Sequence, residues 1–585
     1  MDKDTRSRIQ RATQAARGLL EQDFEDQLAG VFDIRLDGTI AGEPGSHLDA
    51  LQRIVRNKLV AAIEHFRASG QTTAEAVASY RREAAFTTLN RFVALKMLEA
   101  RGLVQECISR GEQSSGFKEF CGLAPGLVQL PDRGYRLYIE SLFDELSVQI
   151  RVLFNRRDAG SLLWPRRQTL LDLLEILNDP GLGGFSAKGS GIRVQGSVAA
   201  STEPRTLNPE PSTVWEQDET IGWIYQYYND EAERKRMREE SSAPRNSREL
   251  AVRNQSGRGV GGEGLQPLRE LYATKDDYLR EIPRLIVEHN LHGIDIDRRA
   301  VQIAGLSLWL RAQRAWYQGG VKPADRPRIR RSNLVCAEPM PGEKELLREF
   351  VEQQFPAGER SAFAFLLEKV FDRMTLAGEA GSLLRIEEEI GDAIAEARAL
   401  AQRQAAPRQF RLSLGDEPPK QTELNLPGLN DEQFWQAAEQ RIYDALKAYA
   451  EQAENGSGFR RRLFADDAAQ GFAFIDLCRK SYDVTVMNPP FGAASTRSRD
   501  YIAKAYPRSK NDLLAACVER GVHWLCPGGL LGAITSRTAF FLTSYRQWRQ
   551  GVVLGEAKPV VMADLGYGVM DAAMVEAAAY VLRKH

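Results

Sequence analysis

The chain has 585 residues, of which 43% are hydrophobic and 27% charged, a globular composition that predicts about two to four domains. Its 78 Lys and Arg residues are balanced by 79 Asp and Glu residues, which gives a formal net charge of −1. This balance excludes a generally basic nucleic-acid-binding protein, so any nucleic-acid surface has to be a local patch.

The cysteines and the first residues bear on the compartment. The six cysteines are scattered without a Cys-x-x-Cys pair, so we expect neither a metal site nor a disulfide framework, as is typical of a reducing compartment. The chain opens directly into a charged helical pattern without an apolar signal core. No apolar run reaches the roughly 18 residues needed to span a bilayer. We therefore expect a cytoplasmic protein with no membrane contact.

Residues 1–180 predict a helical N-terminal domain, because apolar residues recur there at helical spacing. Residues 181–214 are rich in Gly, Ser, Thr and Pro and are interpreted as a linker. The segment 215–228 is crowded with aromatic residues. Such side chains can stack on bases, but at this density burial against a neighbouring domain is the favoured interpretation.

An α/β pattern follows, and one long helical stretch interrupts it. Its first part, within 215–340, contains a strand ending near 297, an apolar helix and a second strand around 329–336. Residues 341–480 have helical periodicity and predict an inserted helical subdomain. The strand pattern resumes in 481–585. We expect one mostly parallel sheet with strands near 292–296, 329–335, 483–487 and 530–535, and further strand-like segments at 560–564 and 574–582.

The most informative segment is Asp483-Val-Thr-Val-Met-Asn488-Pro-Pro-Phe-Gly492. Its strand-like run ends at two prolines, which cannot continue a strand interior because each lacks a backbone donor. The segment therefore predicts a strand that is followed by a rigid turn at the edge of a sheet. A plain strand-ending turn with a core phenylalanine is the alternative interpretation.

Methylation of an exocyclic amino group needs such a turn. The amino nitrogen of adenine is a poor nucleophile, because its lone pair is delocalised into the ring. The side-chain oxygen of Asn488 and a carbonyl of Pro489-Pro490 can accept its two hydrogens, which favours a pyramidal nitrogen and stabilises the charge that develops on it. Phe491 can stack on a base swung out of the double helix.

A second motif, in residues 293–304, is a strand that ends in acid and leads into a helix. In a doubly wound fold an acid at this place accepts hydrogen bonds from ribose hydroxyls, and Asp295 is the candidate. Ile296 is predicted to line an adenine pocket, and Asp297 to cap the helix. Asn333, expected at the end of the next strand, either meets the adenine amino group of a cofactor or is a turn residue. Nicotinamide enzymes share this motif, but together with Asn-Pro-Pro-Phe it points to S-adenosylmethionine.

These residues resemble the adenine-specific DNA methyltransferases of the gamma-type motif order, and more closely the PglX family of BREX phage-defence systems. The segments that carry the resemblance are 221–228, 244–255, 293–310, 332–341, 486–491 and 564–574. The resemblance implies a Rossmann-like S-adenosylmethionine-dependent methyltransferase sheet formed by 215–340 and 481–585. It also implies methyl transfer to the N6 amino group of a flipped adenine in double-stranded DNA, restriction-modification or antiviral defence as the setting, and other phage-defence proteins as partners. Asn488, Pro489, Pro490 and Phe491 would be the catalytic residues.

Two departures from the family set a further expectation. The family has a glycine turn after its first strand, which holds the methionine part of the cofactor, whereas here Gln255 is followed by the glycine-rich segment 256–264 with no strand predicted before it. The family usually continues beyond the point matching His585 into a target-recognition region. The missing glycine turn predicts weak or absent binding of S-adenosylmethionine, and the missing target-recognition region removes the obvious reader of DNA sequence. A degenerate, non-catalytic subunit that binds DNA or defence partners is the alternative, and a protein-glutamine methyltransferase is disfavoured.

Overall fold

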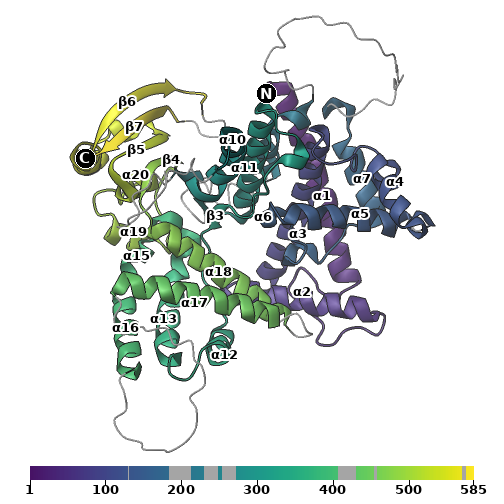
Figure 1. The fold of residues 1–585 in the computed structure, drawn as a ribbon, viewed down its shortest axis with the longest axis horizontal. Coiled ribbons are helices and arrows are strands. Elements are labelled where there is room, and N and C mark those ends of the chain that lie inside the picture. Colours follow the sequence, from purple (N-terminus) through teal and green to yellow (C-terminus); the bar gives the residue numbers. More distant parts are fainter. Residues whose placement is uncertain are drawn as a thin grey trace, which may run out of the picture.

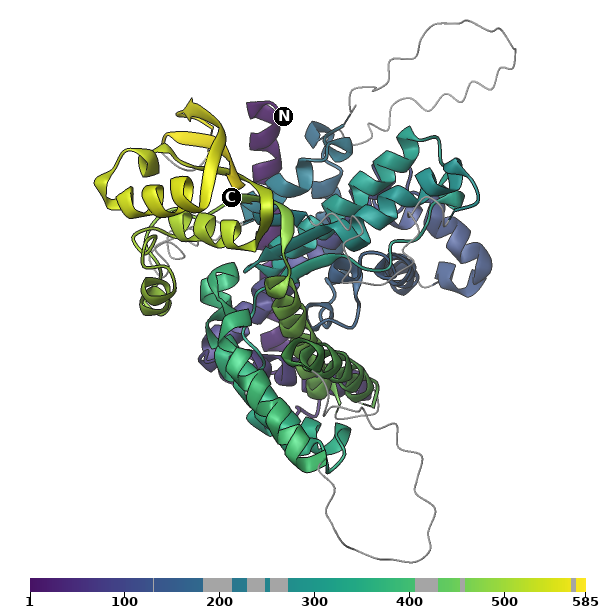
Figure 2. The same ribbon diagram turned by 60° about the vertical axis from the view of Figure 1, so that its left-hand side comes forward.

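The computed structural model describes residues 1–129, 131–182, 213–228, 248–252, 272–405, 430–452, 458–569 and 575–585. The protein is a mixed α/β structure in which helices predominate. In Figure 1 the N-terminal helices lie on one side of the molecule, the sheet on the other, and a group of long helices extends below the sheet. Figure 2 shows these long helices as an arm that leaves the sheet layer.

The N-terminal part is a helical assembly, as the sequence predicted. Its central helix has hardly any exposed side from Ala84 to Leu98, so the other helices pack around it. Its first turn is closed by a capping box in which Thr72 and Glu75 satisfy each other's backbone N–H groups. The helices are α1 (Lys3–Gly30), α2 (Ala50–Ala68), the central α3 (Thr73–Ala100), α4 (Ser115–Leu123), α5 (Pro131–Ser147), α6 (Arg151–Phe154) and α7 (Arg167–Leu177).

The aromatic segment after residue 213 is buried in this N-terminal core. Helix α8 (Thr220–Tyr228) packs against α1, and Phe86 of α3 meets Tyr228 edge to face at a centroid distance of 4.8 Å. Tyr225 and Tyr228 are both almost fully buried. The segment therefore adds apolar contact area to the helical core, which is the interpretation that the sequence favoured over base stacking.

A single sheet of seven strands forms the other half of the structure, in the order β3-β2-β1-β4-β5-β7-β6. The strands are β1 (Arg248–Val252), β2 (Leu291–Asp295), β3 (Asn333–Cys336), β4 (Tyr482–Asn488), β5 (Leu525–Ser536), β6 (Ala557–Gly566) and β7 (Ala577–Lys584). Strands β2 and β3 are parallel, as are β4 and β5, whereas β7 is antiparallel to both of its neighbours. All four strands expected from the sequence are present, although β3 begins only at Asn333.

The central strand β1 corrects the expectation that no strand precedes the glycines. It lies between β2 and β4 and is antiparallel to both, so β2 and β4 run in the same direction. Its last residue, Val252, pairs with Leu291 and Val484 near the first residues of those strands. The chain therefore leaves β1 at the amino edge of its neighbours. The glycine-rich segment 256–264 itself lies outside the described residues.

Every described residue between β3 and β4 lies in a helix or a connecting segment, and none is part of the sheet. The described part of 341–480 is therefore helical, while residues 406–429 and 453–457 lie outside the described residues. The longer helices are α12 (Lys344–Gln354), α13 (Arg360–Arg373), α16 (Gly391–Ala405), α17 (Asp431–Gln452) and α18 (Phe459–Arg479), with two short ones, α14 (Ala377–Ala380) and α15 (Ile386–Glu389). The expected linker 181–214 lies almost entirely outside the described residues.

Two hydrophobic cores meet along this arrangement. One contains the N-terminal helices together with α8 and α11 (Arg298–Gln318), and the other contains sheet residues, the inserted helices and α20 (Leu513–Trp524). Helix α18 contributes to both, because Phe459 and Leu463 belong to the first core and Phe472 to the second. The same helix therefore carries apolar contacts from one half of the molecule to the other.

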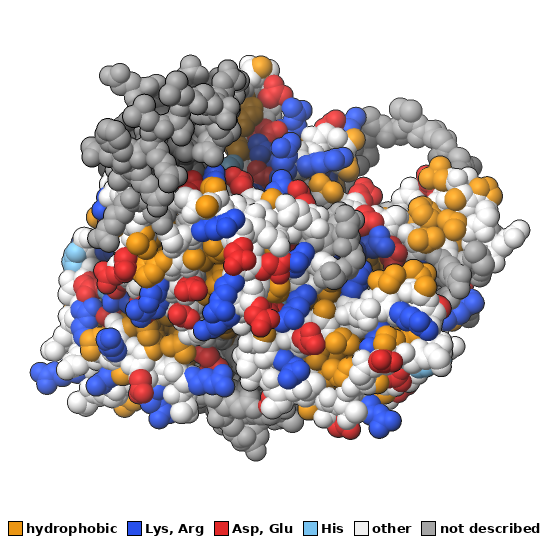
Figure 3. Space-filling model, turned by 90° about the horizontal axis from the view of Figure 1, so that it is seen from below, with side chains coloured by type: hydrophobic (Ala, Val, Ile, Leu, Met, Phe, Trp, Pro, Cys, Tyr) orange, Lys and Arg blue, Asp and Glu red, His pale blue; other side chains and the backbone are white. Residues whose placement is uncertain are grey.

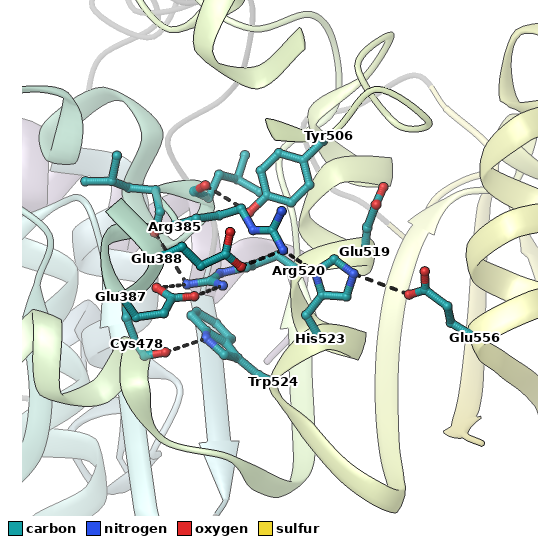
Figure 4. A network of polar contacts seen from close by, with 12 residues as sticks. Arg385, Glu387, Glu388, Cys478, Tyr506, Glu519, Arg520, His523, Trp524 and Glu556 are labelled. Atoms are coloured by element: carbon teal, nitrogen blue, oxygen red, sulfur yellow. Dashed lines mark hydrogen bonds and ion pairs between the residues drawn. The ribbon is translucent and has the colours of Figure 1, made fainter. Parts of the chain in front are cut away.

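A buried ion pair fastens the inserted helices to α20. Arg520 of α20 is 1% exposed, pairs through both terminal nitrogens with Glu387 of α15, and donates from Nε to the Ser382 carbonyl at 2.9 Å. Its guanidinium lies over the Trp524 ring, 4.3 Å from the centroid, as Figure 4 shows. Because the charge has lost its water, these partners have to be kept, and they fix the insert to the sheet layer.

Candidate active site

Two strand ends define the candidate site. Asp295 ends β2 and Asn488 ends β4, and both strands flank β1. Arg248 of β1 pairs with Asn488, while the next residue of β1, Glu249, pairs with Ile294. Asp295 and Asn488 therefore lie at the same edge of the sheet, one strand apart, at a separation of about 10 Å from the usual strand spacing. The sequence predicted this common edge.

The Asn488 side chain has an unused acceptor. The residue is half-buried, and its Oδ1 atom is shielded from solvent without a hydrogen-bond partner among the described residues. A buried amide oxygen without a partner costs about 1–3 kcal/mol. Such an atom is normally satisfied, and this one lies at a strand end, beside the Asn-Pro-Pro-Phe turn.

The turn after Asn488 is held from outside by Asp512, the N-cap of α20. Its Oδ1 accepts hydrogen bonds from the N–H groups of Gly492, at 2.9 Å, and Leu514, at 3.0 Å. The Tyr545 hydroxyl donates to Oδ2 at 2.7 Å, and the Leu513 N–H donates to the Gly492 carbonyl at 2.8 Å. Gly492 has φ of +109°, which only glycine adopts without strain.

This anchoring places Phe491 beside the core. Phe491 is half-buried and packs against the core that includes sheet and α20 residues. Burial raises the pKa of Asp512, against the opposing hydrogen bonds from Tyr545 and the two backbone N–H groups. Sequence reasoning missed Asp512. The available signal was an aspartate directly before an apolar helix, the residue type that favours an N-cap.

At the carboxyl end of β2, Asp295 and Asp297 are hydrogen-bonded to the first residues of α11 and the turn before it. Asp295 is 7% exposed, and its Oδ1 accepts the Asp297 N–H at 2.9 Å. Asp297 caps α11, as predicted, by accepting the Arg299 N–H at 2.9 Å, and it also accepts the Tyr225 hydroxyl at 2.9 Å. Burial works against the ionised form of Asp297, but Arg299 and these hydrogen bonds outweigh it and lower the pKa.

The helical insert covers the residue next to Asp295. A Cβ atom on Gly381, which has φ of +54°, would lie 2.6 Å from the Ile296 Cγ2 atom. Gly381 opens the turn η10 (Gly381–Leu383), which also meets β2. Ile296 is therefore in contact with the insert, so the insert forms one wall beside the Asp295 strand end.

Asn333 is in a different place from the one expected. It opens β3 instead of ending it, and it pairs with His292, near the start of β2. Its side-chain nitrogen donates to the Glu288 carbonyl at 2.9 Å and to the Leu291 carbonyl at 3.4 Å. The residue therefore lies at the amino edge, away from Asp295 and Asn488. The carboxyl end of β3 carries Cys336 and, two residues later, Glu338.

The site matches the ribose side of a nucleotide cofactor such as S-adenosylmethionine better than its methionine side. Asp295 supplies a carboxylate at a strand end, the kind of acceptor to which ribose hydroxyls donate. The methionine side needs a turn that leaves the carboxyl edge between β2 and β4, but β1 fills that position in the reverse direction. The described residues thus place an acid at this edge and provide no glycine turn beside it.

No helix among the described residues is long and apolar enough to cross a membrane. The described residues also contain no group of His, Cys, Asp and Glu side chains that could hold a metal ion. On the face in Figure 3, Lys and Arg side chains are interspersed with Asp and Glu. This mixture agrees with the near-zero net charge.

One family model matches part of the chain. Residues 289–566 match the Eco57I restriction-modification methylase family. This range contains both Asp295 and Asn488, and the match supports DNA methylation as the general activity of the class.

Two relatives are more specific. The chain is 25% identical over 341 residues to the adenine-specific methyltransferase BrxX of Escherichia coli O9:H4 (strain HS), covering 55% of this chain and 24% of that protein. It is 25% identical over 328 residues to the adenine-specific methyltransferase PglX of Lacticaseibacillus casei (strain Zhang), covering 54% and 22%. The matches thus span about a quarter of the length of these relatives. They confirm the predicted resemblance: the chain is related to the adenine-specific methyltransferases BrxX and PglX.

Proposed function

We propose that this chain is the methyltransferase part of a site-specific DNA methyltransferase that transfers a methyl group from S-adenosylmethionine to the N6 amino group of adenine. The observation that carries the proposal is the buried Asn488 Oδ1 atom, which has no partner among the described residues. It stands where a target amino group has to be received, at the same edge as Asp295. The role of the BREX relatives suggests phage defence as the setting.

The proposed chemistry uses the Asn-Pro-Pro-Phe turn. Asn488 Oδ1 and a carbonyl of Pro489-Pro490 accept the two amino hydrogens, which makes the nitrogen lone pair available as the hydrogen bonds strengthen. Phe491 stacks on the adenine after the base has left the duplex. Asp295 accepts the ribose hydroxyls of the cofactor, and Ile296 packs against its adenine. The cofactor supplies the electrophilic methyl group.

We also infer that the sheet descends from a Rossmann-like methyltransferase sheet. The order β3-β2-β1-β4-β5 matches the 3-2-1-4-5 order of doubly wound folds, and β2, β3, β4 and β5 share one direction. Only β1 departs from that pattern, because it runs the other way. Its reversal supports the second candidate function, a non-catalytic subunit that keeps the fold and binds DNA or defence partners.

The test is methyl transfer to duplex DNA at saturating cofactor, measured for Asn488→Ala and for Thr496→Ala. Thr496 is an exposed residue a few positions beyond the turn and serves as the matched control. In a preparation that is active in methyl transfer, such as the chain with a restored strand-plus-glycine segment, we expect Asn488→Ala to lower turnover about a hundredfold, about 3 kcal/mol, with little change in cofactor affinity, since the bond strengthens only as the nitrogen pyramidalises. Equal turnover in both variants would refute the role of Asn488. No transfer by any form would favour the non-catalytic subunit.

A further inference from the structure

A cavity at the opposite edge of the sheet has a chemistry of its own. It has a volume of about 970 Å³ and is lined by side chains from α10 (Lys275–Leu285), the π-helical turn η7 (Ile286–Asn290), the segment 327–331 before β3, and Val148. Because η7 leads into β2 and 327–331 leads towards β3, the cavity lies at the amino edge of these strands. Asn488 and Asp295 lie at the carboxyl edge.

Positive charge is in excess among the described lining residues of this cavity, with four arginines against two glutamates. Arg328, Arg330 and Arg331 are all exposed, and none forms an ion pair with another described residue. Ordinary surface arginines are also exposed, and a run of charge is usually a solvated face. These three guanidinium groups, however, line one concave surface, an arrangement that a merely solvated face does not need.

The acids in the cavity are already engaged by other partners. Arg284 lies 2.6 Å from the carboxylates of both Glu281 and Glu288. Glu288 also accepts the backbone N–H of Arg330 at 2.6 Å. Both carboxylates are therefore hydrogen-bonded to Arg284 or to a backbone group, and the four arginines of the lining outnumber the two glutamates, which leaves a net charge of +2 and three exposed guanidinium groups available to a ligand.

The arginine segment is also held in place. Ile329, between Arg328 and Arg330, is 1% exposed and belongs to the N-terminal hydrophobic core. Its burial and the bond from the Arg330 N–H to Glu288 fix the backbone, so that the neighbouring side chains face outward. Burial and the nearby Arg331 charge lower the pKa of His289, which is consistent with a positive local field.

We propose that this cavity binds the phosphate groups of duplex DNA, at a site separate from the one that receives the target base. Guanidinium groups are the preferred donors to phosphate, because their planar fork matches its oxygen atoms. A nucleotide would share this phosphate chemistry. The described lining, however, holds no Phe, Tyr or Trp ring on which a free base could stack, which favours a sugar-phosphate backbone.

The inference rests on the proposed methylation of DNA. It adds a second contact between the protein and the DNA, apart from the site that receives the target base. A contact limited to phosphates carries no sequence information and is sensitive to salt. The site should therefore raise affinity for any duplex, whatever its sequence. Because it lies at the other edge of the sheet, it should hold DNA independently of the capture of adenine.

The test compares two triple variants by fluorescence anisotropy with a random-sequence duplex over a series of salt concentrations. The first is Arg328→Gln, Arg330→Gln and Arg331→Gln. The control is Arg11→Gln, Arg67→Gln and Arg348→Gln, which removes the same total charge from exposed helical positions with no ion pair to another described residue. Thermal melting confirms that both variants are folded.

We expect the cavity variant to lose about three units of the slope of log affinity against log salt, and to bind at least tenfold more weakly at low salt, while the control stays near the parent chain. Equal losses in the two variants, or no measurable DNA binding by the parent chain, would overturn the proposal. Calorimetry with ATP and inorganic triphosphate is the second arm. If the cavity variant lost binding of ATP and triphosphate but kept the DNA affinity of the parent chain, the cavity would be assigned to a nucleotide instead. Thr496→Ala should leave this binding unchanged, and duplex affinity is measured without methyl transfer, so that a failed catalytic proposal remains distinguishable.

Discussion

At the scale of single residues, the turn after β4 begins at an amide oxygen without a partner, Asn488 Oδ1, and is anchored at its other end by Asp512. Asn488 Oδ1 carries the cost of having no partner in the described structure. Asp512 holds the far end of the turn through the hydrogen bond from the Gly492 N–H, and Asp512 is itself fixed by hydrogen bonds from the Leu514 N–H and the Tyr545 hydroxyl. Such a division is expected where one group has to be ready for a ligand and its neighbours have to keep it in place.

Phe491 is expected to act on base capture more than on the fold. Its ring packs against the core but is only half-buried. We predict that Phe491→Ala weakens binding of duplex DNA that carries the target adenine by about 1–3 kcal/mol, the value of one stacking contact. Phe491→Tyr, which keeps the ring, should retain most of the affinity. Equal affinities of the Ala variant and the parent chain would remove Phe491 from the base site.

Asp512 gives a graded test of the support. Asp512→Ala removes an N-cap and the hold on Gly492, so we predict a loss of about 1–2 kcal/mol in the free energy of unfolding, together with reduced methyl transfer. Tyr545→Phe removes a single bond to Asp512 and should cost less in both respects. Denaturant unfolding and turnover provide the two measurements. If Asp512→Ala lowered stability but left turnover intact, the turn would not depend on this anchor.

At the scale of elements, His65 joins three parts of the chain. It lies on α2, its Nδ1 is 2.8 Å from Glu343, which precedes α12, and its Nε2 is 2.6 Å from Asp467 of α18. Burial lowers the pKa of His65, but the hydrogen bonds and charges of Asp467 and Glu343 outweigh it and raise the pKa to about 10. The imidazolium therefore links the N-terminal helices to the insert.

This linkage predicts a pH dependence. The pKa of His65 is raised in the folded state relative to 6.5, so its contribution to stability is complete below pH 6.5 and is lost as the pH rises towards 10. We predict that the difference in unfolding free energy between the parent chain and His65→Gln is largest near pH 6 and shrinks between pH 6.5 and 10. Taking the difference removes the titration of other groups. A difference that does not change with pH would show that the two carboxylates do not hold His65 as a cation.

The elements also show what could be predicted from the sequence. Strands β2, β4 and β5 were predictable because each is a compact apolar run bounded by a turn, and Asp295 and Asn488 could be placed at one edge because ligands of such sheets bind there. Strand β1 has only five residues, two of them charged, and its partners lie far away in the chain, so no local pattern marks it. Asn333 was misplaced because the alternation around buried Ile329 resembles a strand, although pairing begins only at Asn333 itself.

At the scale of the whole molecule, the sheet has one position between β2 and β4, and β1 occupies it in reverse. A cofactor with a sulfonium group needs a wall on its methionine side, which a parallel strand and its glycine turn would form at the carboxyl edge. A restored segment therefore has to displace β1. The helical insert and the N-terminal core already surround the Asp295 side. We therefore expect only the methionine-side wall, at the strand position between β2 and β4, to be missing from the cofactor site.

Titration of S-adenosylmethionine into the chain by isothermal calorimetry tests this account most directly. We predict weak or undetectable binding to the 585-residue chain, although Asp295 and Asn488 share an edge. A variant with a strand-plus-glycine segment inserted between Gln255 and Leu265 should recover binding, and a Gly/Ser insert of equal length should not. Micromolar binding to the chain as it stands would contradict the account and assign the complete cofactor site to residues already present.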